Sequence, residues 1–159
     1  PCGGGAPGDC MCNAAQLHRY VRRLSGPLLD RFDLRVNVHR PGVDELLAHR
    51  PGESTEVVAA RVAAARSLAF LRQGSLNRSL SGAQLDEFAP ISESGRAVLR
   101  HELENGRLSA RGYHRIRRVA RSVADLRGDA DDVIDDQSVH IALGMRSAFT
   151  NVLPMGCVA

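Results

Sequence analysis

The stretch "SARGYHRIRRVARSVADLRG", residues 109–128, determines most of the fold that the sequence predicts. Ser109 is a favoured residue before the first turn of a helix, and Gly128 is the residue that most often ends one. The apolar residues between them recur at the spacing of one helix face: Ile116, Val119, Ala120 and Val123. We therefore expect a long amphipathic helix here, with one face buried against other helices.

The same signals recur along most of the chain. Serine, asparagine or aspartate at an N-cap position, with glycine at several of the far ends, predicts further helices. The expected ranges are about 14–24, 54–73, 81–88, 92–106 and 135–147, with a short helical turn near 26–32 that Pro27 opens. For the last of these helices either Asp135 or Asp136 is the expected cap. The chain is therefore predicted to be mainly α-helical.

One strand is expected, in "DLRVNV" at residues 33–38, where apolar and polar residues alternate. The following segment contains two Pro-Gly pairs and is typical of a linker. We expect a mixed helix and strand unit over residues 1–50, a helical bundle over 51–148 and a disordered tail over 149–159. The glycine-rich start of the chain resembles a cut inside a longer protein.

The composition excludes several classes of protein. The chain has 159 residues, a net charge of +3 and a pI near 9.0, and all 21 of its basic residues are arginine. A P-loop needs a lysine, so this chain holds no nucleoside triphosphate through a P-loop of its own. Arginines interrupt every apolar run before it reaches the ~18 residues of a membrane helix. We expect a cytoplasmic protein without a secretory signal.

Three cysteines, Cys2, Cys10 and Cys12, lie within one glycine-rich loop. Zinc in a structural site takes four ligands, and a Cys-x-Cys pair on a loop supplies two of them. Cys157 lies at the far end of the sequence, so the three cysteines form at most an incomplete Zn²⁺ site. Three free thiols are the alternative.

Four arginines of the opening stretch are candidate functional residues. Arg111 falls in the first turn of the predicted helix, at the positive end of its dipole, where phosphate groups bind readily and arginine supplies paired donors. Arg115, Arg118 and Arg121 continue at helical spacing opposite the apolar face. They form either a solvated basic surface or a contact surface for nucleic acid.

A second candidate is Arg31 in "SGPLLDRFD", residues 25–33. It stands between Asp30 and Asp33, directly before the predicted strand. In the simplest interpretation it forms ion pairs with these two neighbours in a turn.

Several motifs in order resemble the magnesium-chelatase-like AAA+ ATPases of the YifB/ComM group, over residues 1–147. They are "LHRYVRRLSGPLLDRFDLRVNV" at 17–38, "RQGSLN" at 72–77, "LSARGYHRIRRVARSVADL" at 108–126 and "VHIALGMR" at 139–146. The cysteine loop also resembles an insertion of that group, which favours the ComM-like branch. The resemblance is to the C-terminal half of these proteins.

The resemblance implies a role for each of the two candidate sites. Arg31 matches the arginine finger, which acts on ATP bound by the neighbouring subunit of a ring. Arg111 matches the sensor-2 arginine, which contacts the ATP of its own subunit. Residues 13–38 match the end of the AAA+ α/β core, and the later helices match its helical lid. ATP and Mg²⁺ would bind mainly to an upstream core, so the isolated chain is expected to be inactive as an ATPase.

Three functions remain open at this point. The ComM-like branch implies a homo-oligomeric ring that uses ATP to remodel DNA during recombination. The same motor could instead assist metal chelation. The third is a small helical nucleic-acid-binding module without an ATPase role, in which Arg115, Arg118 and Arg121 contact DNA.

Overall fold

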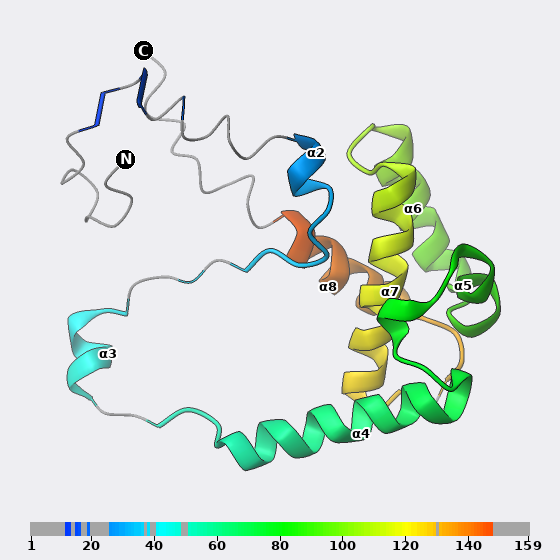
Figure 1. Cartoon of the computed structure of the whole chain (residues 1–159), viewed down its shortest axis with the longest axis horizontal. Coiled ribbons are helices and arrows are strands. Elements are labelled where there is room, and N and C mark those ends of the chain that lie inside the picture. Colours follow the sequence, from blue (N-terminus) through cyan, green and yellow to red (C-terminus); the bar gives the residue numbers. More distant parts are fainter. Residues whose placement is uncertain are drawn as a thin grey trace.

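The computed structural model is mainly helical, as the sequence predicts (Figure 1). It describes residues 12–13, 15–16, 19, 26–36, 38, 41–48, 51–129 and 131–147. The helices are α2 (Gly26–Leu29), α3 (Val43–Leu47), α4 (Thr55–Gln73), α5 (Gly82–Phe88), α6 (Glu93–Glu104), α7 (Ala110–Arg127) and α8 (Asp136–Ser147), with a 3₁₀ turn η1 (Asn77–Ser79). None of the described helices is long and apolar enough to span a bilayer.

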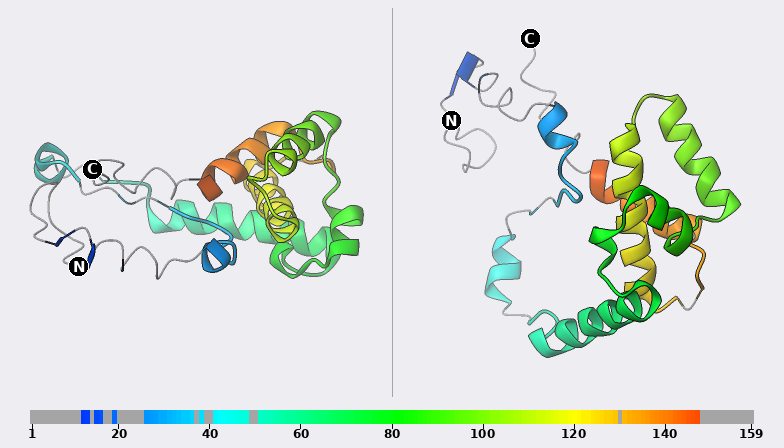
Figure 2. Two further views of the ribbon diagram at one scale, coloured as in Figure 1. Left: turned by 90° about the horizontal axis from the view of Figure 1, so that it is seen from above. Right: turned by 45° about the vertical axis from the view of Figure 1, so that its right-hand side comes forward.

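Helix α7 is the centre of the bundle, with α4, η1, α5 and α8 packed against it and α6 packed against α8. Figure 2 shows α7 enclosed by these elements, whereas α3 lies apart from them. The core consists of fully buried apolar side chains, among them Leu80, Leu85, Leu99, Ile116, Ala120, Ile134, Val139 and Ala142. The predicted apolar face of the 109–128 helix therefore lies in the core.

The predicted helix ends are confirmed. The sequence allows them to be predicted because each end depends on hydrogen bonds within one helical turn. Ser109 accepts a hydrogen bond from the Gly112 amide at 3.0 Å, and Ser54, Ser81 and Ser92 cap their helices in the same way. Gly74 and Gly128 end α4 and α7 with φ values of 70° and 74°, a conformation that glycine adopts without strain. At the start of the chain, Asn13 and Gln16 form the expected capping box. Most of the helix predicted over 14–24 lies outside the described residues.

Asp135 is the residue that caps α8. Its carboxylate accepts a 2.8 Å hydrogen bond from the Ser138 amide and another of 2.8 Å from the Arg127 guanidinium at the end of α7. Partial burial acts to raise the pKa of Asp135, but these hydrogen bonds and the charge of Arg127 lower it to about 2. One ionised side chain thus joins the end of α7 to the start of α8.

The predicted strand at residues 33–38 is wrong for the part that the structure describes. Residues 33–36 and 38 form no strand there, and Val36 is exposed. A strand needs a neighbouring strand for its backbone hydrogen bonds, and the described residues contain only one isolated bridge, between Ile91 and Ile134. Instead, the Arg35 amide donates to the Met145 carbonyl of α8 at 2.8 Å.

Two further expectations need correction. The linker-like segment contains α3, whose first turn is closed by a 3.0 Å hydrogen bond from the Gly42 amide to Glu45. Helical spacing along 54–73 places Val58, Val62, Ala65 and Leu68 on one side, which we expect to be buried. On α4, however, only Ala65 and Ala69 are buried, whereas Val58 and Val62 are exposed. The reason is visible in Figure 1, where the N-terminal half of α4 extends beyond the end of α7.

A buried polar network joins α4 and η1 to α7 around the carboxylate of Asp125. It accepts hydrogen bonds from Arg72 at 2.5 Å, from Asn77 at 2.7 Å and from Arg121 at 3.0 Å. Burial and the nearby charge of Arg121 lower the pKa of Arg72, while Asp125 acts to raise it. Arg121 also donates to the carbonyls of Asp131 and Asp132. One buried and one partly buried cation therefore share one carboxylate.

The substitution Asp125→Asn should destabilise the fold severely, because Arg72 and Arg121 would lose their shared counter-charge. Breaking a buried ion pair in this way typically costs about 3–5 kcal/mol of unfolding free energy. Urea unfolding followed by circular dichroism measures this change. The control Glu53→Gln makes the same chemical change in the exposed Glu53–Arg61 pair and should leave the unfolding midpoint unchanged. An unchanged midpoint for Asp125→Asn would contradict the role of the network.

The Asp135 cap should make stability depend on pH in the acid range. The pKa of Asp135 is lower in the folded chain, so its contribution is complete above about pH 4 and disappears as the pH falls through about 2. Asp135→Asn keeps a capping side chain without the charge. We expect it to cost about 1 kcal/mol at neutral pH, a value discounted for solvent screening. The difference from the unmodified chain should shrink toward pH 2 in urea titrations, and a constant difference would contradict this.

Candidate functional site at the amino-terminal end of α7

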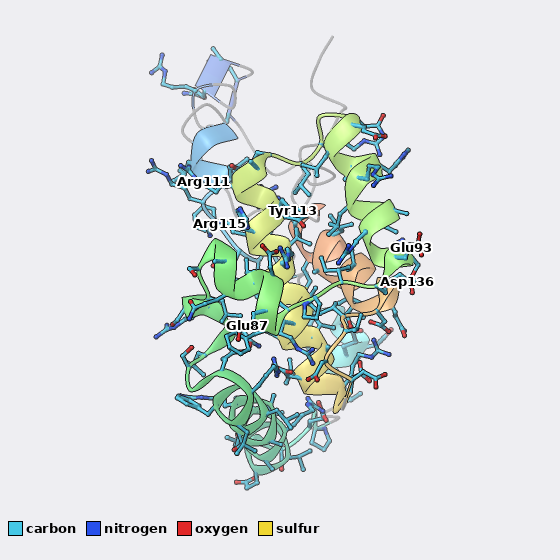
Figure 3. All side chains as sticks on the ribbon, turned by 90° about the vertical axis from the view of Figure 1, so that its right-hand side faces the viewer. Glu87, Glu93, Arg111, Tyr113, Arg115 and Asp136 are labelled. Atoms are coloured by element: carbon cyan, nitrogen blue, oxygen red, sulfur yellow. The ribbon has the colours of Figure 1, made fainter. Side chains whose placement is uncertain are left out.

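The segment that follows α2 lies against the first turn of α7 and the last turn of α8. Figure 3 shows Arg111 and Arg115 on the side of α7 that adjoins α2, with Tyr113 on another side. Arg31, to which the family resemblance assigns an ATP contact, lies in the segment after α2, and Arg111 lies in the first turn of α7.

Asp30 attaches the segment to both helices. Its carboxylate accepts a 2.9 Å hydrogen bond from the hydroxyl of Ser109 and also forms an ion pair with Arg146 of α8. Ser109 is the N-cap of α7, so this carboxylate lies at the positive end of the helix dipole. Burial acts to raise the pKa of Asp30, but the Ser109 hydrogen bond and the charges of Arg146 and Arg111 outweigh it and lower the pKa.

A second ion pair attaches the residues that follow Arg31 to α7. Asp33 accepts a 2.5 Å hydrogen bond from Arg115, one turn further along α7. Between the two aspartates, the carbonyl of Phe32 accepts a 3.4 Å hydrogen bond from Arg146. The residues on both sides of Arg31 are therefore bound to the helical bundle.

Gly112 allows this close approach in the first turn of α7. A Cβ atom at this position would lie 2.8 Å from Leu108 Cδ1 and 3.0 Å from the Nη2 atom of Arg146. Both distances are shorter than a stable van der Waals contact. A larger residue would therefore displace Arg146 from its place beside Asp30.

The backbone after the turn is fixed as well. Arg35 donates from its guanidinium to the carbonyl of Leu29 at 2.9 Å, and its amide donates to Met145. Burial and the charge of Arg146 lower the pKa of Arg35. A groove of about 1130 Å³ opens beside this segment, and α6 and α8 form its other walls.

Arg31 does not form the ion pairs that its neighbours in sequence suggest. Its side chain is exposed and makes no hydrogen bond or ion pair with any residue that the structure describes, because Asp30 and Asp33 bind Arg146 and Arg115 instead. The side chain of Arg111 is also exposed and forms no hydrogen bond or ion pair with a described residue. The interpretation of Arg31 as part of a salt-bridged turn is therefore wrong in this structure.

The other predicted arginines of α7 lie in three different environments. Arg115 is partly buried and paired with Asp33, and Arg118 donates to the carbonyl of Leu80 at 2.9 Å. Arg121 is only 1% exposed, so the expectation that it faces solvent opposite the apolar face is wrong. Its charge is used inside the bundle by Asp125, and its guanidinium is not accessible to DNA or a partner.

Arg117 is a residue that the sequence reasoning missed. It is buried and donates to the carbonyls of Leu85 and Ala89, at the end of α5, and to the carboxylate of Asp86 at 2.7 Å. A cation is favoured at this negative end of a helix. In the sequence Arg117 follows Tyr113 by four residues, a spacing at which two side chains meet on one helix face, and its guanidinium lies 5.4 Å from the Tyr113 ring centroid.

The zinc prediction is not tested by the structure. Cys2 and Cys10 lie outside the described residues, and Cys12 is partly buried. Within the described part of the chain, no group of three or more histidine, cysteine or acidic side chains is arranged to hold a metal ion. A Zn²⁺ site in the cysteine loop stays a prediction.

Asp30→Ala should release the segment after α2 from α7 and α8. A hydrogen bond to a charged group contributes about 1.5–3 kcal/mol, so the Arg35 amide should exchange with solvent roughly tenfold faster or more. Hydrogen exchange followed by NMR measures this, with Glu87→Ala as a control that removes an exposed carboxylate of α5. Because the pKa of Asp30 is lowered, protection should be complete above its ordinary pKa and fall in more acid solution. Unchanged exchange in Asp30→Ala would contradict this attachment.

Comparison with protein families identifies two matching regions. Residues 52–146 match the family described as magnesium chelatase, subunit ChlI C-terminal, and residues 1–46 match magnesium chelatase, subunit ChlI. The two regions together cover nearly all of the chain, with Arg31 in residues 1–46 and Arg111 in residues 52–146. The residues expected as finger and sensor therefore lie in different matched regions.

Individual relatives agree with this match. An uncharacterized protein of Mycobacterium tuberculosis is 43% identical over 92% of this chain, and the uncharacterized protein YifB of Escherichia coli is 37% identical over 86%. The competence protein ComM of Haemophilus influenzae is 35% identical over 83%. The chain spans only 29%, 27% and 26% of the lengths of these three relatives.

Proposed function

The chain belongs to the magnesium chelatase family of ChlI-like proteins, together with YifB and ComM, and on this basis we propose that it forms the lid and finger portion of a ring-forming AAA+ ATPase. In this proposal the helices of residues 51–148 are the lid, and the segment around α2 is the end of the ATPase core. Arg31 acts on the ATP of a neighbouring subunit, and Arg111 contacts the ATP of its own.

The observation that carries the proposal is the pairing of the two aspartates beside Arg31. Asp30 and Asp33 are both bound to other arginines, so Arg31 keeps an exposed guanidinium that no described residue neutralises. An arginine that reaches into a neighbouring site needs this freedom. It stabilises negative charge that develops on the transferred phosphoryl group, and such arginines contribute factors of about 10³–10⁵ in rate.

Arg111 fits the second role by position. It is exposed in the first turn of α7, where the helix dipole disfavours a cation by about 0.3–1 kcal/mol. A bound phosphate reverses this penalty, because the anion interacts with both the helix end and the guanidinium. In the described structure the charge of Arg111 helps to lower the pKa of Asp30, whose carboxylate lies at the same helix end.

The residues present fit one part of an ATP site. Two unpaired cations suit phosphate, but the sequence contains no lysine for a P-loop. ATP with Mg²⁺ would therefore be held mainly by the core that the relatives' greater length can accommodate, where it supplies the phosphoryl group and the metal charge. In this proposal Arg31 would orient the phosphoryl group of the neighbouring subunit's ATP, and Arg111 would bind the ATP of its own subunit.

The work done with ATP is proposed to be ComM-like remodelling of DNA. The support is the similarity to a protein named for competence and the family group that the motifs resemble. Assistance of metal chelation is the second candidate, supported by the family description as a magnesium chelatase subunit. The independent nucleic-acid-binding module has lost support, because Arg115, Arg118 and Arg121 are paired, hydrogen-bonded or buried.

Arg31→Ala should abolish most ATP hydrolysis in a full-length assembly that carries this chain after an intact ATPase core. We expect kcat to fall by a factor on the order of 10³ with the KM for ATP little changed, since the finger acts on the transition state in a neighbouring site. Steady-state ATPase assays measure both constants. The matched control Arg100→Ala removes another exposed arginine, from α6, and should leave the rate unchanged.

The same assembly separates the candidate functions. An unchanged rate in Arg31→Ala would remove the finger assignment. Tight, salt-dependent DNA binding by the isolated chain, lost in the Arg115→Ala, Arg118→Ala double variant, would instead support the binding module. Stimulation of ATP hydrolysis by branched DNA would favour DNA remodelling over chelation.

A further inference from the structure

We propose that Arg146 and Arg115 are positioning residues that clamp the Arg31 turn onto the lid helices, so that the lid sets the direction of the finger. This inference rests on the proposed function, because it gives Arg31 its role in a neighbouring site. It assigns a task to two arginines whose ion pairs within the described residues are with Asp30 and Asp33 alone.

The first half of the clamp comes from α8. Arg146 uses Nη2 on the carboxylate of Asp30 and Nη1 on the carbonyl of Phe32, so one guanidinium bonds to the residues immediately before and after Arg31. The side chain of Arg146 is only 11% exposed, which reduces screening of the ion pair by solvent. The planar fork of arginine fixes both acceptors in one geometry.

The second half of the clamp comes from α7. Arg115 bonds to Asp33 at 2.5 Å, and Ser109 bonds to Asp30 at 2.9 Å, so two points of the turn are attached to the first two turns of one helix. The three clamping side chains are 79 to 116 residues away in sequence from their acceptors. The bundle therefore holds the turn in addition to the turn's own local hydrogen bonds.

The four contacts on either side of Arg31 couple the backbone of the turn to α7 and α8. The backbone before and after Arg31 moves with α7 and α8, while its side chain stays unpaired within the described structure. Arg111 belongs to the same first turn of α7 as the cap that holds Asp30. A shift of α7 that follows phosphate contact at Arg111 would therefore be transmitted directly to Arg31. Positioning on this scale matters, since a displacement of about 1 Å can lower a rate about 10²-fold.

Mixed rings test this proposal separately from the finger assignment. The acceptor subunits carry Arg31→Ala and an intact core, and the donor subunits carry Arg31 but lack the P-loop lysine of their core. Hydrolysis then occurs only in acceptor sites that receive a finger from a donor. Donors with the unmodified clamp should restore ATP hydrolysis, measured as kcat and KM for the mixture.

The clamp variants are placed in the donors alone. Donors with Arg146→Ala or Arg115→Ala should lower the restored kcat by a factor on the order of 10² and leave the KM unchanged, because the acceptor's own ATP contacts are intact. The double exchange Asp33→Arg, Arg115→Asp reverses one ion pair and should recover most of the rate. Analytical size exclusion confirms that each donor enters the ring.

Arg127→Ala in the donor is the matched control. It removes an arginine from the same helix and breaks an ion pair of similar exposure, with Asp135, at the opposite end of α7. It should lower stability without lowering the restored rate.

Each result has one meaning. Full rescue by donors with Arg146→Ala and with Arg115→Ala overturns the clamp and leaves the finger in place. An equal loss in the Arg127→Ala donors overturns it too, because the loss then reflects stability alone. Failure of donors with the unmodified clamp to restore any hydrolysis overturns the finger assignment, and the clamp with it.

Discussion

The carboxylate of Asp125 is the constraint on which the helical bundle depends. It lies inside the protein with Arg121 on its own helix and Arg72 on α4, and neither cation has another described carboxylate within hydrogen-bond distance. Buried charges are tolerated only when they are paired and hydrogen-bonded. This requirement fixes the rotation of α7 about its axis, with Arg117 and Arg121 inward. The same rotation places Arg111 and Arg115 beside α2, so the interior at one end of the helix determines the site at the other.

The sequence allowed the helices to be predicted because their ends are local. A serine and the amide three residues later, or a glycine with positive φ, lie within one turn, so Ser109 and Gly128 could be recognised without knowledge of the fold. The burial of Arg121 was not recognised, because helical spacing alone assigns every arginine to the polar face. The signal was Asp125 four residues later, a spacing at which opposite charges meet on one helix.

The segment around Arg31 was harder to predict because the contacts that attach it to the bundle come from residues distant in sequence. Alternating residues after Asp33 suggested a strand, but a strand is defined by its partner, and the described partner of Arg35 is the carbonyl of Met145 in a helix. Adjacency likewise suggested that Arg31 pairs with the aspartates beside it. Short side chains on neighbouring residues diverge, whereas long arginines from α7 and α8 reach them. The sequence therefore identified Arg31 as a candidate functional residue, but it could not show that its guanidinium has no partner among the described residues.

Because the chain contains no lysine, every basic side chain in these contacts is an arginine guanidinium. A guanidinium carries five donors in a rigid plane, so Arg146 bonds to a carboxylate and a carbonyl together, and Arg117 bonds to three acceptors around the end of α5. Arg146, Arg117 and Arg121 thus each bind two or more acceptors within the bundle. Arg31 and Arg111 have none among the described residues, although Arg111 lies at the helix end that least favours a cation. Both guanidinium groups are therefore available to an anion, which in our proposal is phosphate, whose oxygens match the paired donors of arginine.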